Sequence, residues 1–335
     1  MLLDESWAVL FGYSMKIAVV GCGAVGSYYG AKLCRAGHEV HFLLRSDFEE
    51  VRRQGVWIES AEGPFHVQPL CARAPQEIGH ADLVLIALKT TANHVLQQML
   101  PPLTGPQTAV LTLQNGLGNE AIVAAIAGTE KTMGGVCFVC LNRVAPGRIL
   151  HLAHGNIALG EYGRPPQART HQMAQAIAGA GVPCKVAENL TQVRWEKLVW
   201  NIPFNGLGVA GAAGLDAVLH GRIPPGTPLL GCLTTDVLLA HPGWEKIVRE
   251  LMMETIATAR AQGLNVPETA ADHQIERTRQ MGAYKASTLL DFENGRELEL
   301  DGLFLEPLRQ ARQARVPCPR LAALCAVLTQ LAKHG

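Results

Sequence analysis

The chain has no excess of charge of either sign, because 29 Lys and Arg residues stand against 29 Asp and Glu residues. Without a basic excess there is no electrostatic basis for binding nucleic acid. Long apolar runs are missing too. Gly, His, Lys or Asn interrupts each stretch before it reaches the roughly 18 residues that a membrane span needs. We therefore expect a cytoplasmic protein with neither a nucleic-acid partner nor a membrane partner.

The nine Cys residues lack the pattern of a disulfide or metal framework. Their number is odd, and they are scattered through hydrophobic segments such as Val136–Leu141, as expected of reduced core thiols in a cytosolic protein. Cys137 and Cys140 form a Cys-x-x-Cys pair, but no second pair completes a metal site. Core packing is the favoured interpretation and redox or metal chemistry the alternative, so we predict no metal site.

A composition typical of disorder is absent as well. Of the 335 residues, 48% are hydrophobic and 17% are charged, which permits a sizeable core. At roughly 100–200 residues per domain, this length predicts two domains. The first fourteen residues lack the basic and then apolar pattern of a signal peptide. Met15 directly precedes the first convincing strand, so we interpret residues 1–14 as an N-terminal extension.

Strands and helices alternate through the first third of the chain. Apolar, β-branched runs predict strands at Lys16–Gly21, His38–Arg45, Ala81–Lys89 and Ala109–Leu113, and a helix at Cys22–Gly37 lies between the first two. Such alternation is typical of a parallel sheet with helices on both faces. The sequence therefore predicts an α/β fold with a Rossmann-type, doubly wound parallel sheet.

The pattern changes twice further along the chain. Between residues 134 and 186 we expect strand-like pieces at 134–141, 147–152 and 157–162, and a helix at His171–Ala180, all extending the same sheet. After Asn189 the helical patterns dominate, at Gln192–Leu207, Gly243–Gln262, Thr269–Tyr284 and Leu298–Ala314. We therefore place a Rossmann domain at residues 15–187 and an all-helical substrate and catalytic domain at residues 188–335.

A glycine-rich turn joins the first predicted strand to the first predicted helix. Residues 21–26 read Gly21-Cys22-Gly23-Ala24-Val25-Gly26, a G-x-G-x-x-G pattern. Gly21 permits the tight turn, Gly23 lets the backbone approach a pyrophosphate, and Gly26 lets the helix pack close to the strand. The helix N-terminus adds N–H groups and a positive dipole end for the phosphates. This context predicts a dinucleotide-binding site, whereas the glycines alone would be a weak signal.

The end of the second predicted strand favours NADP over NAD. An NAD enzyme usually places Asp or Glu here to bind the ribose 2′-hydroxyl, but this chain has Leu44-Arg45-Ser46. The Arg45 guanidinium suits a 2′-phosphate, and Ser46 adds a donor. A solvated Arg is the alternative, and Asp47, two residues further on, keeps NAD open.

An unusual polar pattern opens the helical domain. Lys197, Asn201 and Asn205 are spaced i, i+4, i+8 among large apolar residues, so on a helix they share one face. One interpretation is a polar site; the other is a surface Lys with two helix-capping Asn residues. Pro203 cannot donate a backbone hydrogen bond, so we expect the helix to kink or end there.

Several separated segments together resemble the ketopantoate reductase (2-dehydropantoate 2-reductase) family. They are KIAVVGCGAVGSYYGAKLCRAGHEV from Lys16, LKT at Leu88–Thr90, QNG at Gln114–Gly116, WEKLVWNIPFN from Trp195, and more weakly Ser287–Leu290 with Glu299-Leu300-Asp301-Gly302. The resemblance runs from about Met15 to the C-terminus. It implies a fold like that of 6-phosphogluconate dehydrogenase, with a Rossmann domain followed by a helical domain.

The resemblance also implies a role for each matching position. Lys197 would be the general acid that protonates the developing alkoxide, and Glu299 the carboxylate that orients Lys197 or a substrate hydroxyl. Cofactor-binding positions would be residues 21–26, Arg45, Lys89 and Asn115, and substrate-binding positions Asn115, Asn201, Asn205 and Ser287. A cationic proton donor beside the ketone lowers the barrier, because hydride addition leaves negative charge on oxygen.

The implied function is NADPH-dependent reduction of 2-dehydropantoate to pantoate in pantothenate and coenzyme A synthesis. The chain departs from the family pattern after Asn205, where it reads GLGVAGAAGLDAVL, and at Gly302, which lacks a preceding Asn. The alternative is therefore a paralogous reductase of another small 2-oxo acid. A non-catalytic NADP-binding sensor is a third hypothesis, but it would need none of the catalytic candidates. A homodimer is one open alternative for the oligomeric state.

Overall fold

The computed structural model describes residues 14–333, and within that range the chain divides into two compact units. The first comprises the described residues up to Gln114 together with Asn119–Leu190; the second comprises Asn115–Gly118 and the described residues from Thr191. Residues 1–13 of the predicted extension lie outside the described residues. The four residues Asn115–Gly118 are thus grouped with helices that follow much later in the chain. A single boundary between residues 187 and 188 does not divide the chain in this way.

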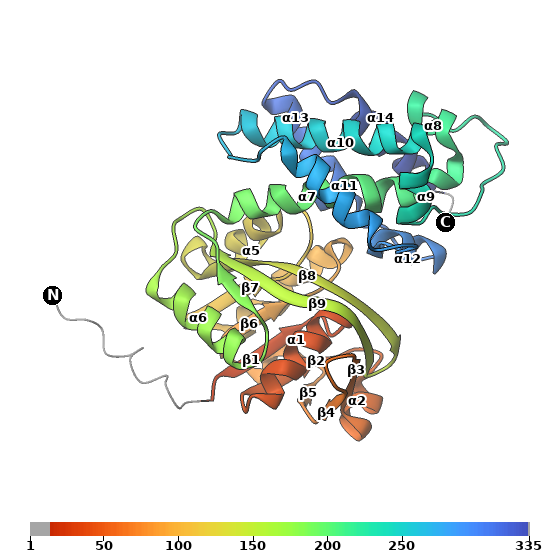
Figure 1. Ribbon diagram of the computed structural model, residues 1–335. Helices are drawn as coiled ribbons and strands as arrows, with labels where there is room; N and C mark the ends of the chain where they lie inside the picture. The colour runs from red at the N-terminus through yellow and green to blue at the C-terminus, as the bar shows by residue number, and fades with distance from the viewer. Residues whose placement is uncertain (1–13, 334–335) are drawn as a thin grey trace. The chain divides into compact units, whose positions relative to one another are not determined.

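The first unit is built on one sheet with the strand order β4-β3-β9-β8-β7-β6-β1-β2-β5, and β10 pairs with β9 (Figure 1). The strands are β1 (Lys16–Val20), β2 (Glu39–Leu43), β3 (Val56–Ser60), β4 (Phe65–Val67), β5 (Leu70–Ala72), β6 (Ala81–Ile86), β7 (Thr104–Thr112), β8 (Thr132–Ala145), β9 (Arg148–Glu161) and β10 (Cys184–Val186). From β5 to β8 every neighbouring pair is parallel. This part is the predicted doubly wound sheet.

The sheet as a whole is mixed rather than parallel. The pairs β8–β9 and β3–β4 are antiparallel. Only Pro146 and Gly147 connect β8 to β9, and so short a connection can join only antiparallel strands. The pieces predicted at 147–152 and 157–162 are one continuous strand, β9, so the prediction of two separate strands was wrong.

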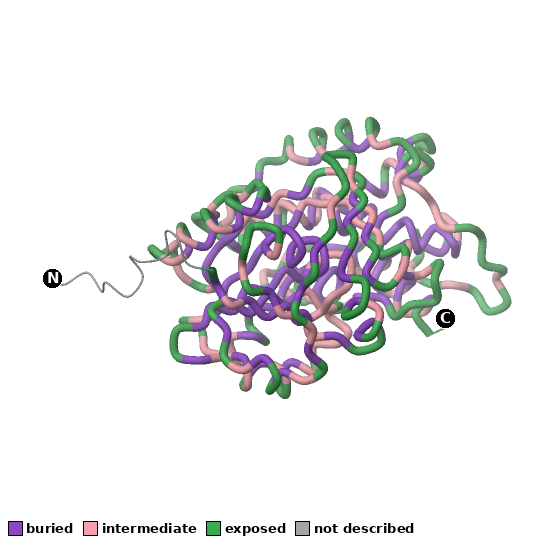
Figure 2. The backbone as a smooth tube through the Cα atoms, turned by 90° about the horizontal axis from the view of Figure 1, so that it is seen from below, coloured by how far each residue is buried: buried purple, intermediate pink, exposed green. Residues whose placement is uncertain are grey.

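Alternate residues of the central strands build two apolar layers, one on each face of the sheet. On one face Ile17 packs in a cluster with α1 (Ala24–Arg35) and α6 (Ala168–Gly179). On the other face Ala18 packs in a cluster with α4 (Leu96–Met99) and α5 (Asn119–Ala127). The buried stretches run along the strands and the inner helix faces, whereas many of the connecting loops are exposed (Figure 2). The shorter helices are α2 (Phe48–Gln54) and α3 (Pro75–Ile78).

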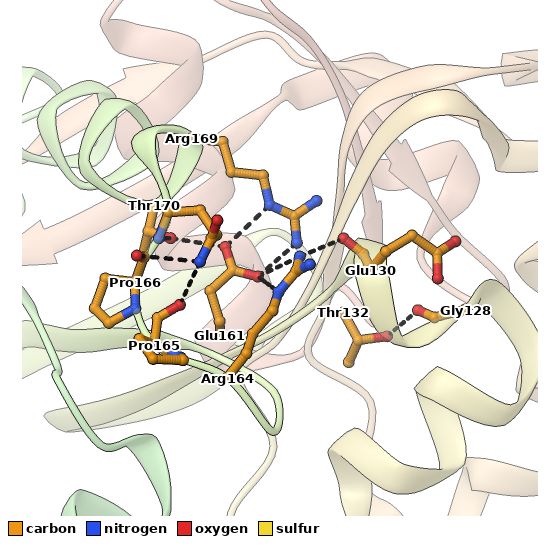
Figure 3. Close-up of polar contacts among 10 residues, drawn as sticks. Gly128, Glu130, Thr132, Glu161, Arg164, Pro165, Pro166, Arg169 and Thr170 are labelled. Atoms are coloured by element: carbon orange, nitrogen blue, oxygen red, sulfur yellow. Dashed lines mark hydrogen bonds and ion pairs between the residues drawn. The ribbon is translucent and has the colours of Figure 1, made fainter.

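The last residue of β9, Glu161, carries a buried carboxylate. Arg164 and Arg169 converge on Glu161, at 2.9 and 2.6 Å from Oε2, and the Thr170 hydroxyl donates to Oε1 at 2.7 Å (Figure 3). Burial raises the pKa of Glu161, whereas the hydrogen bonds from Arg169, Thr170 and Arg164 lower it, and the net pKa lies below the usual value. The cluster fixes the start of α6 against the sheet.

The second unit is helical. It contains α7 (Leu190–Ala210), α8 (Leu215–His220), α9 (Thr235–Ala240), α10 (Pro242–Ala261), α11 (Thr269–Arg279), α12 (Ser287–Glu293), a π-helical turn η5 (Asp301–Leu305), α13 (Glu306–Gln313) and α14 (Pro319–Leu331). Its core gathers the apolar residues of α7 with those of α10 and α14. None of the helices in residues 14–333 is both long and apolar enough to cross a membrane.

Three helix predictions in this unit need correction. The helix predicted at Gln192–Leu207 is α7, and of the kink or end expected at Pro203 the end does not occur: α7 runs on to Ala210, because the buried residues that follow pack into the core. The helix expected at Leu298–Ala314 is a π-helical turn followed by α13, so Glu299 precedes the helical segment. The helix expected at Thr269–Tyr284 ends at Arg279.

Candidate active site

The glycine turn after β1 has a backbone path that excludes side chains at two of its glycines. Gly21 has φ +101°, and a Cβ there would lie 2.4 Å from the backbone nitrogen of Leu88. A Cβ on Gly26 would lie 2.1 Å from the carbonyl oxygen of Gly21. Because neither glycine has a Cβ, the backbone at the start of α1 can lie this close to the turn and to the segment after β6.

Gly23 differs from its two neighbours, because a Cβ built on it would meet no atom within 4 Å. It occupies the N-cap position of α1, where no side chain caps the helix and the first turn carries no acidic residue. The N–H groups and the positive dipole end of α1 are therefore available to an anion. The residues of this turn fit the pyrophosphate of a dinucleotide.

The ends of β2 and β6 flank the turn, because Val20 pairs with Leu43 on one side and with Ile86 on the other. The Cys22 thiol ties the turn to β2 by donating to the carbonyl oxygens of Val19 and Leu43, both at 3.6 Å. Burial, together with Cys71 and Asp47, raises the pKa of this thiol well above its usual value, so it stays protonated as a donor.

Arg45 and Asp47 follow β2 and differ in their surroundings. Arg45 is exposed, whereas Asp47 is buried. The Asp47 carboxylate accepts from Arg143 Nη2 at 2.5 Å and from Ser46 Oγ at 2.9 Å. The cation that suits a 2′-phosphate is thus accessible, and the nearby acid already has protein donors.

Lys89 follows β6 as the N-cap residue of the 3₁₀ turn η1 (Thr90–Val95) and is exposed. Asn93 in the same turn belongs to a chain of hydrogen-bonded side-chain amides that was not predicted from the sequence. Asn93 donates to Asn119 Oδ1 at 3.1 Å and accepts from Gln114 Nε2 at 2.7 Å, and Thr112 donates to Gln114 Oε1 at 2.9 Å. Polar residues that follow neighbouring parallel strands, whose carboxyl ends meet at one edge, were the signal that could have found it.

In the second unit, three segments that are far apart in the sequence meet. Lys197 Nζ on α7 donates to Asn115 Oδ1 at 2.6 Å. Next to it, Gly116 has φ +84°, and a Cβ there would lie 2.3 Å from the carbonyl of Gly302. Leu117 N donates to Gly302 O at 2.9 Å. Residues Asn115–Leu117, the helix α7 and the segment after Glu299 therefore form one local structure within the second unit.

The other predicted polar residues of this unit differ in burial. Asn201 on α7 is 5% exposed, Glu299 is 7% exposed, and Lys197 is half-buried. The Lys197 ammonium is a cationic donor, and its hydrogen bond to Asn115 Oδ1 fixes the position of Nζ. Such a cation, held beside a buried carboxylate-bearing segment, has the chemistry of a proton donor to a developing alkoxide.

Asn205 is a helix cap in this structure. Its Oδ1 accepts from Thr288 N at 3.1 Å, from Thr288 Oγ1 at 3.0 Å and from Ser287 Oγ at 3.2 Å. It thus satisfies the first turn of α12 and joins that helix to α7. For Asn205 the structure shows the capping contact of the alternative interpretation, and it brings Asn205 and Ser287 together.

No cluster of three or more His, Cys, Asp or Glu side chains within residues 14–333 is arranged to hold a metal ion. Cys137 is buried in the core of the first unit, in the cluster that contains α1 and α6. The described part of the chain thus offers a dinucleotide turn and a Lys-centred polar group as its chemistry-bearing features.

Two models of one protein family match the chain. The model of the family "Ketopantoate reductase PanE/ApbA" matches residues 17–164, and the model of its C-terminal domain matches residues 217–332. The chain belongs to the ketopantoate reductase family. Members of this family are dinucleotide-binding reductases of small molecules.

Individual relatives match over nearly their full length. The 2-dehydropantoate 2-reductase of Nostoc sp. is 38% identical over 92% of both chains. The crystal structure of the Geobacter metallireducens 2-dehydropantoate 2-reductase is 42% identical, covers 94% of this chain and 99% of its own, and has a TM-score of 0.84. A D-mandelate dehydrogenase solved with NADH and anilino(oxo)acetate is 20% identical, covering 96% and 99%, with a TM-score of 0.81, and shares the fold.

Proposed function

We propose that this ketopantoate reductase family member catalyses the NADPH-dependent reduction of 2-dehydropantoate to pantoate, a step of pantothenate and coenzyme A synthesis. The observation that carries the proposal is the hydrogen bond from Lys197 Nζ to Asn115 Oδ1. It gives the cationic group a fixed position in the helical unit. The names of the Nostoc and Geobacter relatives support the substrate.

Lys197 serves as the general acid in this proposal. A reduced nicotinamide held by residues 21–26 and Lys89 would supply a hydride to the ketone carbon, which would leave the electron pair of the carbonyl bond on oxygen. The Lys197 ammonium stabilises that oxygen and gives it a proton, and solvent then reprotonates the amine. Asn115 holds the ammonium by accepting one of its three N–H donors at 2.6 Å, so less conformational freedom is lost when the substrate arrives.

Glu299 and the amides select the substrate. Glu299 is buried at 7% exposure, and a buried carboxylate that accepts a substrate hydroxyl penalises a substrate without one. Asn201 and Ser287 serve as substrate-binding groups, and Asn205 serves through its contact with Ser287. Lys89 and residues 21–26 serve as cofactor-binding positions.

Arg45 selects NADPH over NADH. It is exposed at the end of β2, where the ribose 2′ position lies in dinucleotide-binding folds, and a guanidinium matches a phosphate in charge and geometry. We expect NADPH to bind at least about tenfold more tightly than NADH, which corresponds to about 1.4 kcal/mol. Arg45→Ala should erase most of that difference in a fluorescence titration, and equal wild-type affinities would refute the assignment.

The substrate is tested with steady-state NADPH oxidation on a matched pair of ketones. Trimethylpyruvate has the carbon skeleton of ketopantoate but lacks its hydroxyl group. We expect kcat/KM for ketopantoate to exceed that for trimethylpyruvate by about 10- to 100-fold, the effect of losing a hydrogen bond to a charged group. Glu299→Ala should lower kcat/KM for ketopantoate and leave kcat/KM for trimethylpyruvate nearly unchanged. For ketopantoate, kcat/KM of Glu299→Gln should lie between that of the wild type and that of Glu299→Ala.

The same experiment identifies the alternative substrate class. If Glu299→Ala lowers turnover of both ketones equally, Glu299 acts through Lys197 and does not recognise the hydroxyl. If another 2-oxo acid has a higher kcat/KM than ketopantoate, the chain is a reductase of that acid with the same proton donor. The observation that favours this alternative is that the D-mandelate dehydrogenase solved with anilino(oxo)acetate shares the fold.

A further inference from the structure

The start of α2 concentrates acidic groups beside the position proposed for the 2′-phosphate. Asp47, Glu49 and Glu50 follow Arg45 within five residues. Glu49 is exposed and Glu50 is half-buried, and they pair with Arg73 and Arg53, which lie on the surface.

Asp47 differs from the two glutamates because it is buried, with 10% of its side chain exposed. It lies two residues after Arg45, close to where NAD-binding proteins place the acid that accepts the ribose 2′-hydroxyl. A carboxylate without a cationic partner at this point would repel a 2′-phosphate and would offer an acceptor to a 2′-hydroxyl.

Both oxygens of the Asp47 carboxylate have donors from the protein. Arg143 Nη2 donates to Oδ2 at 2.5 Å, and Ser46 Oγ donates to Oδ1 at 2.9 Å. Arg143 comes from β8, almost one hundred residues later in the chain, and its side chain is 39% exposed.

The backbone of the β8–β9 hairpin, and not a mobile loop, brings Arg143 to α2. Arg143 pairs with Ile149 across the hairpin, and β9 pairs in turn with β3. Trp57 N donates to Gly147 O at 2.8 Å, and a Cβ on Gly147 would approach the carbonyl oxygen of Gly55 at 2.8 Å, so the end of the hairpin is fixed just beyond α2.

We propose that Arg143 determines the cofactor preference by neutralising Asp47, an inference that rests on the NADPH dependence of the proposed function. Paired with Arg143, Asp47 neither repels the 2′-phosphate that Arg45 binds nor accepts a hydrogen bond from a 2′-hydroxyl. Without Arg143 the same carboxylate disfavours NADPH and favours NADH. Arg143 is thus a specificity-determining residue that acts through Asp47.

The test measures Kd for NADPH and NADH by fluorescence titration of the purified full chain, independently of turnover. Arg143→Gln should reduce the preference for NADPH by about tenfold or more, with weaker NADPH binding and unchanged or tighter NADH binding. Asp47→Asn alone should keep the wild-type preference. Adding Asp47→Asn to Arg143→Gln should restore it to within about threefold, because the repelling charge is gone.

Two further variants keep the test decisive. Arg73→Gln breaks the neighbouring exposed pair with Glu49 and should leave the preference unchanged. Arg143→Lys keeps the positive charge and should keep most of the preference. If Arg143→Gln does not fold, the double variant, which leaves no buried unpaired carboxylate, must still prefer NADPH.

The inference is overturned if Arg143→Gln folds and keeps the wild-type preference, or if the double variant has lost it. The second result would mean that Arg143 contacts the phosphate itself or supports the fold. A wild-type chain with equal affinities would overturn the NADPH assignment of the proposed function and this inference together. A wild-type preference that is insensitive to Arg143→Gln overturns this inference alone.

Discussion

The two units of this protein differ in whether backbone or side chains form the proposed site. In the first unit the turn proposed to bind the dinucleotide is made by backbone, with glycines at positions where a Cβ would collide and with no side chain capping the start of α1. In the second unit the proposed site is made by side chains that separate segments contribute, since Lys197 on α7 contacts Asn115 and Asn205 on the same helix contacts Thr288. Backbone sites tolerate few substitutions but depend on few residues, whereas side-chain sites depend on long-range contacts.

This contrast predicts its largest effect at Lys197, because a side-chain proton donor has no backbone substitute. Lys197→Ala should lower kcat by about 10²- to 10⁴-fold, the usual effect of losing a positioned acid. The Kd for NADPH should stay within about twofold of the wild-type value, because Lys197 belongs to the helical unit. Stopped-flow turnover and NADPH titration measure the two quantities. A variant with near-full kcat would show that another group or water supplies the proton.

The glycine turn offers a matched pair that separates folding from binding. A Cβ on Gly26 collides with the Gly21 carbonyl, so Gly26→Ala should destabilise the first unit by about 2–3 kcal/mol. Gly23 faces open space, so Gly23→Val should leave the thermal midpoint nearly unchanged and still weaken NADPH binding by at least about tenfold. Calorimetry and titration compare them. Normal NADPH binding by Gly23→Val would place the phosphate site elsewhere.

In the first unit, Glu161 is the centre of a cluster of side chains. Glu161→Gln should destabilise the protein by about 2 kcal/mol at neutral pH, because two Arg side chains lose their buried partner. The pKa of Glu161 is lower in the folded state than its usual 4.5, so its contribution is present above that value and is lost as pH falls through the folded pKa.

Urea unfolding of the wild type and of Glu161→Gln between neutral pH and about pH 3.5 should therefore show the stability difference shrinking toward low pH. Glu130→Gln is the control, because its side chain is exposed and Arg164 contacts only its backbone carbonyl. A stability difference that is constant with pH would mean that the carboxylate charge does not stabilise the cluster.

The smallest expected effect is at Asn205. Asn205→Ala removes the acceptor at the first turn of α12 and should cost about 1 kcal/mol of stability, as the loss of other helix caps does. Asn205→Asp keeps an acceptor oxygen and should recover most of the loss. Thermal unfolding measures both. If Asn205→Ala instead leaves stability unchanged and raises KM, Asn205 acts on the substrate and not as a cap.

The fold of the first unit was predictable because its signals are local. Buried strands, a glycine turn and a helix in sequence indicate a doubly wound sheet, and the structure confirms that fold. The antiparallel addition of β9 was not predicted, because β9 is interrupted in the sequence by polar residues such as His154, which has a positive φ of 65°. A search for alternating apolar and polar residues does not recognise such an irregular strand as one continuous element.

The site of the second unit was predictable only in part. The i, i+4 spacing placed Lys197 and Asn201 on α7, and the family resemblance pointed to Asn115. Neither could show that Asn205 caps α12, since that contact joins residues more than eighty positions apart. The helix predicted at Gln192–Leu207 already included Pro203, and α7 does continue through it, because tertiary packing of the apolar residues after Pro203 outweighs the lost backbone hydrogen bond.

The grouping of Asn115–Gly118 with the helices has a consequence for dividing the chain experimentally. The polypeptide passes from one unit to the other after Gln114, after Gly118 and after Leu190, so no single cut yields two whole pieces. A fragment that starts at Thr191 would lack Asn115, the acceptor of Lys197, and would lose the turn packed against Gly302. Grafting this helical unit onto another cofactor-binding domain therefore requires transplanting a four-residue loop as well.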